Sequence, residues 1–125
     1  MSAALDYQMP STAVSLLFAF RSRDPQMSVL DAVAFALISE NEGLSQTELA
    51  ELLGEPSYVV SRVVDYLGQG TTQTGRAQRQ QGLGLIERVP WDRDRRVRVL
   101  RLTQAGRVLR TSLDSLVIRP QTLGR

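Results

Sequence analysis

The feature that constrains the fold most is a helix whose two ends are both marked in the sequence. Ser45–Glu48 has the spacing of a capping box, in which the serine hydroxyl accepts from the glutamate amide and the glutamate carboxylate reaches back. Leu44 and Leu49 have the spacing of a hydrophobic staple, and Gly54 suits the left-handed position after a helix. We expect the inward side of this helix to consist of Leu49, Leu52 and Leu53.

A second helix is predicted over residues 57–67, directly after the first. Val60, Val63, Val64 and Leu67 recur at helical spacing, and the strict alternation of a strand is absent, although β-branched residues favour strands. The two helices and their short connection form a helix-turn-helix over residues 44–67. The outward side of the second helix then carries Ser57, Tyr58, Ser61, Arg62 and Asp65.

A β-hairpin and a final helix follow. Leu85–Pro90 and Val97–Leu102 are predicted strands, joined by the arginine-rich segment Trp91–Arg96. Thr103 is expected to cap a helix over Gln104–Ile118, which a proline stops. A helix-turn-helix followed by such a hairpin is a winged helix, a mostly α fold with a small two-stranded β-wing that presents a helix to the DNA major groove. The last helix has its apolar stripe at Val108, Leu109, Leu113, Leu116 and Val117.

Two helices are predicted before the helix-turn-helix. The first spans Ser11–Phe20 and is followed by a break, because Asp24 precedes a proline. The second spans Val29–Ser39, with Ser28 as its N-cap and Asp31 at N3. Since it is apolar on nearly every side, it is either buried or part of an oligomer interface. The whole chain (1–125) is therefore predicted to form one winged-helix domain. Its parts are the N-terminal and dimerisation helices (1–43), the helix-turn-helix (44–67), an insert loop (68–84), the wing (85–102) and the C-terminal helix (103–118).

Residues 68–84 form an unusually long connection that is rich in glycine, glutamine and threonine. One hypothesis is a solvated loop. The other is a basic arm, partly helical over Arg76–Gln81, in which Arg76 and Arg79 contact phosphate. Connections of this length are either functional or disordered, so the sequence leaves both hypotheses open.

Charge is divided unequally along the 125 residues. The formal net charge is +2, but residues 1–56 carry two arginines against eight carboxylates, and residues 57–110 carry eleven arginines against four carboxylates. Lysine is absent. A one-sided basic region is typical of proteins that bind a polyanion.

The residue types that are missing exclude several functions. The chain has no cysteine and no histidine, which removes disulfides, thiolate metal sites and the commonest general base. No catalytic constellation stands out, so we expect neither an enzyme nor a metal or cofactor. Residues 1–11 lack the basic and apolar parts of a signal peptide, and no apolar run is long enough to span a membrane. A cytoplasmic location without a membrane partner is therefore expected.

Four segments resemble, in family order, the MarR family of bacterial winged-helix regulators. They are LSQTELAELLG (44–54), SRVVDYL (61–67), GLIER (84–88) and DRRVRVLRLTQAGR (94–107). The resemblance covers roughly Ser28–Leu109 and implies a homodimer that binds double-stranded DNA, with the second helix of the motif in the major groove and a wing arginine in the minor groove. Two features depart from the family: the connection over residues 68–84 is much longer, and the terminal helices that usually form the dimer are shorter.

The resemblance also assigns the site residues, with Arg96 as the wing-tip arginine and Asp94 as the aspartate that orients it. The chemistry agrees, because arginine can clamp a phosphate or a guanine edge with two hydrogen bonds, hydroxyls suit phosphate oxygens, and an arginine on a narrow hairpin fits the negative potential of a narrow minor groove. The candidate DNA contacts are Ser57, Tyr58, Val59, Ser61, Arg62, Arg76, Arg79, Arg93, Asp94, Arg95 and Arg96.

These assignments have structural alternatives. Asp94 and Arg96 could form only a surface ion pair, worth less than ~1 kcal/mol. Arg62 could pair with Asp65 or Tyr66. We expect the ring of Trp91 to pack at the base of the wing and not against the sugar-phosphate backbone.

At the level of function, the expectation is a MarR-like transcriptional regulator. The alternative is a winged-helix protein-interaction module, or a replication or partition accessory module of plasmid or phage type. A small-molecule effector is compatible with the resemblance, but no residue identifies one.

Overall fold

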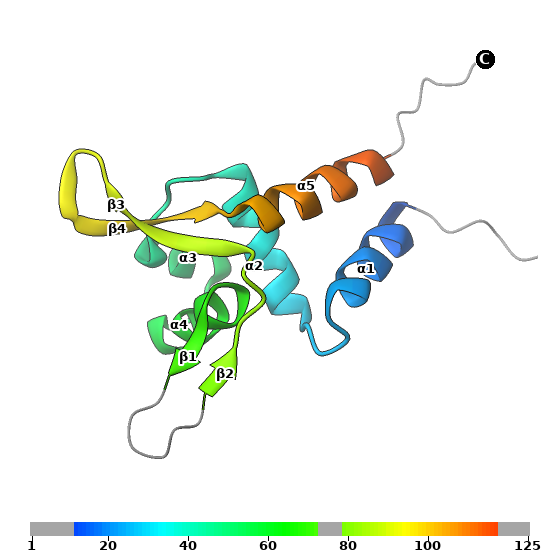
Figure 1. Ribbon diagram of the computed structural model, residues 1–125, viewed down its shortest axis with the longest axis horizontal. Coiled ribbons are helices and arrows are strands. Elements are labelled where there is room, and N and C mark those ends of the chain that lie inside the picture. The colour runs from blue at the N-terminus through cyan, green and yellow to red at the C-terminus, as the bar shows by residue number, and fades with distance from the viewer. Residues whose placement is uncertain (1–11, 73–78, 118–125) are drawn as a thin grey trace, which may run out of the picture.

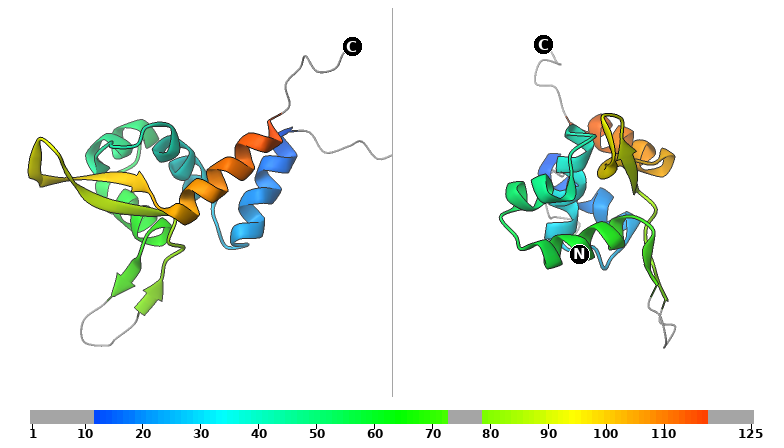
Figure 2. Two further views of the ribbon diagram at one scale, coloured as in Figure 1. Left: turned by 45° about the horizontal axis from the view of Figure 1, so that its top comes forward. Right: turned by 90° about the vertical axis from the view of Figure 1, so that its left-hand side faces the viewer.

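The computed structural model describes residues 12–72 and 79–117, and within them the chain forms five helices and two β-hairpins (Figure 1). The wing lies at one end of the molecule, and the first and last helices lie side by side at the other end (Figure 2). In chain order the elements are α1 (Thr12–Arg23), α2 (Val29–Glu40), α3 (Gln46–Leu53), α4 (Ser57–Leu67), β1 (Gly70–Thr72), β2 (Arg79–Gln81), β3 (Ile86–Trp91), β4 (Asp94–Leu102) and α5 (Gln104–Leu116).

Two capping boxes fix where α2 and α3 begin. The Ser28 hydroxyl accepts from the Asp31 amide at 3.0 Å, and the Asp31 carboxylate accepts from the Ser28 amide at 2.9 Å. In α3 the Glu48 amide donates to the Ser45 hydroxyl at 3.1 Å, and the Ser45 amide donates to the Glu48 carboxylate at 2.8 Å. Gly54 ends α3 with φ of 69°, in the left-handed region. The predicted capping box of α3, the N-cap Ser28 of α2 and the glycine at the end of α3 are confirmed.

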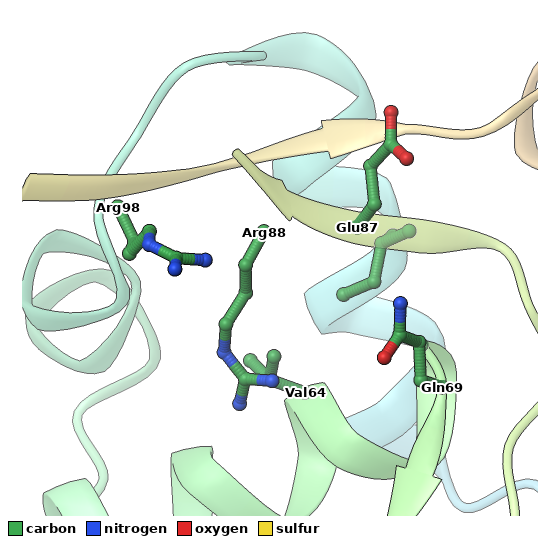
Figure 3. A pocket seen from close by; sticks show the side chains of 7 residues that line it. Val64, Gln69, Glu87, Arg88 and Arg98 are labelled. Atoms are coloured by element: carbon green, nitrogen blue, oxygen red, sulfur yellow. The ribbon is translucent and has the colours of Figure 1, made fainter. Parts of the chain in front are cut away.

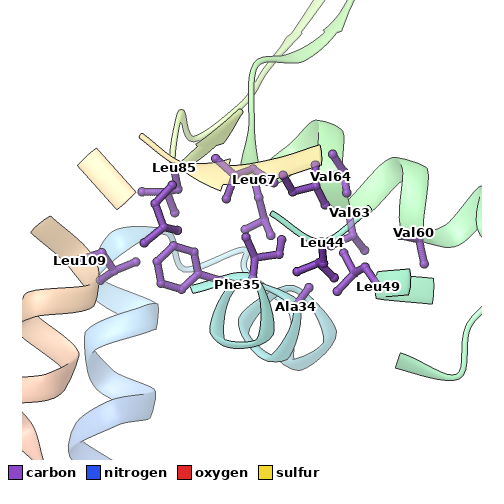
Figure 4. Packing of buried hydrophobic residues seen from close by; sticks show 14 of the residues in the cluster. Ala34, Phe35, Leu44, Leu49, Val60, Val63, Val64, Leu67, Leu85 and Leu109 are labelled. Atoms are coloured by element: carbon purple, nitrogen blue, oxygen red, sulfur yellow. The ribbon is translucent and has the colours of Figure 1, made fainter. Parts of the chain in front are cut away.

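The core lies between α2, α3, α4, the base of the wing and α5 (Figure 4). Phe35 of α2 and Leu49 of α3 have no exposed surface. The prediction for α3 is wrong at Leu52, whose side chain is 57% exposed, because the buried side of this helix is centred on Leu49, Ala50 and Leu53 and Leu52 lies on its far flank. The predicted inward side of α4 is confirmed, with Val60, Val63, Val64 and Leu67 all buried.

The second wing strand begins earlier than predicted, at Asp94 instead of Val97, and the first is shifted by one residue, from Leu85–Pro90 to Ile86–Trp91. β3 and β4 pair antiparallel from Ile86↔Leu102 to Pro90↔Arg98, and Trp91 pairs with Asp94 after an irregularity in register. The prediction that Trp91–Arg96 is a loop is therefore wrong. The alternation of arginine and valine in DRRVRV continues the period of a strand almost to the tip, so that the two strands enclose only a two-residue turn.

The predicted insert loop, residues 68–84, contains a second hairpin instead. β1 pairs antiparallel with β2, with Gly70 opposite Gln81. The partly helical arm proposed for residues 76–81 is contradicted at 79–81, which form β2, while Arg76 lies outside the described residues. The strands are polar and short, so no apolar periodicity marked them in the sequence.

After the β1–β2 hairpin, the chain returns to the C-terminal end of α4. The Gly84 amide donates to the Gly68 carbonyl at 2.8 Å, and the Leu85 amide donates to the Leu67 carbonyl at 2.8 Å. The Leu83 amide donates to the Tyr66 carbonyl at 2.9 Å. The hairpin is thus an addition to the end of α4 whose two ends meet at that helix.

Replacing residues 70–81 with a short glycine turn is therefore expected to leave the rest of the fold intact. The free energy of unfolding should change by less than about 1 kcal/mol, because shortening a surface connection changes its closure entropy only slightly. Thermal unfolding followed by circular dichroism measures this. A shortened chain that no longer unfolds cooperatively would show that the hairpin is part of the core structure.

Apolar side chains also remain exposed on the terminal helices and on α2. On α5, the predicted apolar stripe is divided: Leu109 and Leu113 are buried, whereas Val108 and Val117 are more than half exposed. The N-terminal helix begins at Thr12 and continues to Arg23 instead of ending at Phe20. The exposed apolar residues at this end of the molecule are Val14, Leu17, Phe18, Val29, Val33, Val108 and Val117.

Polar contacts tie α1 to the end of α4. The Tyr66 hydroxyl donates to the Asp24 carboxylate, and Arg23 Nη2 donates to the Leu83 carbonyl at 2.7 Å. Burial, together with the hydrogen bond to Asp24, raises the pKa of Tyr66, so the phenol keeps its proton and remains the donor. The orientation of α4 is thereby coupled to the N-terminal helix.

Candidate nucleic-acid interface

The exposed side of α4 carries an arginine, Arg62, that has no partner in the part of the chain that the structure describes. Tyr58 is 68% exposed and Arg62 lies one turn farther along the same side. The alternative that Arg62 pairs with Asp65 or Tyr66 is wrong, since Asp65 pairs with Arg88 and the Tyr66 hydroxyl bonds Asp24. Among the described residues, no hydrogen bond or ion pair involves the Arg62 guanidinium. Ser57 is exposed as well, whereas Val59 and Ser61 are half-buried.

Near the tip of the wing, Asp94 holds Arg96 in a defined orientation. Asp94 Oδ1 accepts from the Arg96 amide and from Arg96 Nε, both at 3.1 Å, and Asp94 Oδ2 accepts from Nη2 at 3.3 Å. The Arg96 side chain is nevertheless 90% exposed. Hydrogen bonds from the Arg96 side chain and amide lower the pKa of Asp94, so the carboxylate stays ionised at neutral pH. The pair therefore presents an oriented guanidinium to solvent.

Trp91 lies at the tip of the wing, which contradicts its predicted place at the base. Its ring is 39% exposed, and the Arg93 guanidinium lies 5.9 Å from the ring centroid, a cation–π contact. The difference arises because β3 includes Trp91 and β4 begins at Asp94, so that these two residues pair beside the turn. Arg95 is exposed as well, so the tip region carries three exposed arginines, Arg93, Arg95 and Arg96, of which Arg93 contacts the aromatic ring.

Arg88 joins the wing to both helices of the helix-turn-helix. Its Nη2 lies 3.1 Å from Asp65 Oδ1 of α4, and its guanidinium donates to Gln46 Oε1 of α3 at 3.3 Å. The sequence reasoning missed Arg88, although strand alternation after the buried Ile86 would have placed it on the face toward the helices.

The second hairpin leaves α4 in a direction different from that of the wing (Figures 1 and 2). Arg79 lies in β2, and Arg76 lies outside the described residues. The structure therefore brings together two groups of candidate residues, those on α4 and those on the wing, but does not place Arg76.

Within residues 12–72 and 79–117, no three acidic or other metal-ligating side chains are clustered closely enough to hold an ion. In the same part of the chain, no helix has the length and apolar content needed to cross a membrane.

Comparison with solved structures identifies the fold. FabT of Streptococcus pneumoniae, solved in complex with DNA, is 20% identical with a TM-score of 0.61, and the match covers 83% of this chain and 64% of FabT. The repressor CouR, solved on a 23-mer DNA duplex, is 26% identical with a TM-score of 0.55, over 84% of this chain and 66% of CouR. MarR is 18% identical with a TM-score of 0.55, over 82% of this chain and 69% of MarR. No family model matches the sequence, and no curated protein matches it.

The chain has the fold of the MarR-family winged-helix regulators, as its sequence motifs predicted. It spans slightly less than two thirds of the length of FabT.

Proposed function

We propose that the chain is a DNA-binding transcriptional regulator of MarR-like type. The observation that carries the proposal is the exposed wing-tip Arg96, which Asp94 orients, together with Arg62 on the second helix of the helix-turn-helix, which is exposed and pairs with none of the described residues. The guanidinium of Arg96 on the wing and that of Arg62 on α4 suit duplex DNA, which offers negative charge along two grooves.

In the proposed complex, α4 enters the major groove and the wing reaches the minor groove. Arg62 bonds a guanine edge or a phosphate, and the hydroxyls of Ser57, Tyr58 and Ser61 bond phosphate oxygens. Arg96 enters the minor groove, where a narrow groove concentrates negative potential. We assign Arg93, Arg95, Arg76 and Arg79 to the phosphate backbone, and Val59 to apolar contact with bases.

A second copy of the chain completes the proposed regulator. The apolar side chains that remain exposed on α1, α2 and α5 support this, because a dimer would remove them from water. A shallow groove lined by Ala19, Val108 and Leu109 runs between α1 and α5 and gives a partner helix a place to pack. A two-fold dimer would read two half-sites related by the same symmetry.

Selection of bound duplexes from a random library tests this function. We expect enrichment of one sequence with two inverted half-sites, about one helical turn apart. The variant Arg62→Ala should lose that enrichment while keeping its fold. Recovery of random sequence by the unmodified chain would contradict sequence-specific regulation.

The added β1–β2 hairpin favours one alternative, a winged-helix module that binds another protein in a replication or partition assembly. The hairpin projects from the end of α4 as a separate element, to which a protein partner could bind (Figure 1). Two results together would favour this alternative over the regulator. The chain would bind a stable protein partner only while residues 70–81 are present, and it would have no affinity for duplex DNA.

A further inference from the structure

A small polar cleft lies where the wing meets the end of α4 (Figure 3). Its volume is about 160 Å³, and Val64 and Gly68 form its wall on the helix side. Arg88 of β3 and Arg98 of β4 line it from the wing. Both arginines lie on the side of the wing that faces the helix, while Glu87 points to the other side (Figure 3).

The pairing of the strands explains why these two arginines converge. Arg88 follows the buried Ile86 by two residues and so lies on the same face of β3. Arg98 lies directly opposite Pro90, which is two residues beyond Arg88 on that face. One face of the two-stranded wing therefore presents both guanidiniums to the cleft.

The guanidiniums of Arg88 and Arg98 differ in whether a carboxylate pairs with them. Asp65 pairs with Arg88 at 3.1 Å and fixes its position. Arg98 is exposed, and no described residue forms a hydrogen bond or an ion pair with it. Glu87 also lines the cleft, but its carboxylate points away from both arginines (Figure 3). With Arg88 paired to Asp65, the guanidinium of Arg98 is the positive charge left facing the cleft, which suits a singly charged phosphodiester.

The position of the cleft indicates which phosphate would reach it. Tyr58, Arg62 and Asp65 follow one another along the exposed side of α4, and Asp65 leads directly to Arg88. The wing-tip Arg96 lies two residues from Arg98 on β4. If α4 occupies the major groove and the wing tip the adjacent minor groove, the DNA strand that separates the two grooves passes between them.

We propose that Arg98, supported by Arg88, binds a backbone phosphate of that dividing strand and so sets the register of the wing against α4. The proposal rests on the proposed DNA-binding function and extends it to two residues outside the predicted site. Because phosphate is common to every sequence, Arg98 contributes affinity and register but no choice between bases.

The test is a salt titration of duplex binding by the full chain and its variants, followed by anisotropy of labelled DNA. Each phosphate contact adds about 0.9 to the slope of log K against log salt, so Arg98→Ala in a dimer should flatten the slope by about 2. The ratio of the affinity of the unmodified chain to that of Arg98→Ala should fall about tenfold when salt is raised from about 50 mM to about 200 mM. Arg98→Lys should keep the slope of the unmodified chain, because it keeps the charge.

Arg101→Ala is the matched control. Arg101 lies on the same strand but on the opposite face of the wing, and its removal changes the net charge equally. We expect its slope to equal that of the unmodified chain. Thermal unfolding should be alike for the two Arg98 variants and the unmodified chain, since Arg98 has no partner to lose among the described residues. Arg101 helps to lower the pKa of Glu42, so the unfolding of Arg101→Ala is measured separately.

The outcomes separate the two claims. Equal slopes for Arg98→Ala and Arg101→Ala, in a chain that binds duplex DNA, would overturn the cleft proposal and leave the proposed function standing. A loss of preference at a single base-pair position in Arg98→Ala, with the other positions unchanged, would also overturn it, because that pattern indicates a contact to a base edge. Absence of duplex binding by the unmodified chain would overturn the proposed function, and the cleft proposal with it.

Discussion

Replacing Arg96 with alanine is expected to weaken duplex binding about a hundredfold at low salt. Hydrogen bonds to charged groups contribute about 1.5 kcal/mol or more each, and a dimer carries two wing tips. The sum of about 3 kcal/mol corresponds to a factor of about one hundred in affinity. The fold should be unaffected, because the Arg96 side chain is 90% exposed and, among the described residues, bonds only Asp94, two positions before it. Anisotropy with a fixed duplex measures the change.

Asp94→Ala separates the charge of Arg96 from its orientation. This variant keeps the arginine but removes all three hydrogen bonds that hold it. We expect Asp94→Ala to lose more affinity than Arg101→Ala and less than Arg96→Ala. This loss should occur although removing the aspartate raises the net positive charge of the chain. If Asp94→Ala bound DNA more tightly than the unmodified chain, charge alone would govern the wing, and the orienting role of Asp94 would be wrong.

The second large effect concerns stability, at Gly106 in the first turn of α5. A Cβ at this position would lie 2.1 Å from the Leu85 carbonyl oxygen, which is far inside van der Waals contact. That carbonyl cannot easily move, because it accepts from the Thr103 amide at 3.0 Å while the Leu85 amide donates to Leu67 at 2.8 Å. Gly106→Ala is therefore expected to lower the free energy of unfolding by about 3 kcal/mol, the upper part of the range for overpacking.

Gly54→Ala is the matched control, since it adds the same methyl group. Gly54 has open space around its Cβ position but a φ of +69°, so alanine there meets only the strain of the left-handed region, about 1 kcal/mol. Urea unfolding of both variants gives the comparison. If Gly106→Ala were as stable as Gly54→Ala or more so, the close packing of α5 against the start of the wing would be contradicted.

The parts of the fold that could be predicted are those that neighbouring residues determine. The capping boxes of α2 and α3 depend on side chains three residues apart, and the inward side of α4 depends on helical spacing. The β1–β2 hairpin could not be predicted, because its polar strands pair with each other and leave no apolar pattern. Leu52 was misplaced because the sequence does not show which flank of α3 its neighbours cover.

The candidate site divides in the same way. Asp94 and Arg96 are two residues apart, so their pairing followed from the local sequence and the family resemblance. Arg88 meets Asp65 and Gln46 only through the tertiary fold, across separations that no spacing rule covers. Trp91 was assigned to the base of the wing because the extension of β3 and β4 toward the tip was not foreseen.

The most direct test of the central claim is the salt dependence of duplex binding by the unmodified chain. If a dimer neutralises about six phosphates or more, log K should fall against log salt with a slope of about −5 or steeper. The same slope should appear on random and selected duplexes, with higher affinity for the selected one. A flat response, or no binding at low salt, would contradict the assignment of α4 and the wing as a DNA-binding surface.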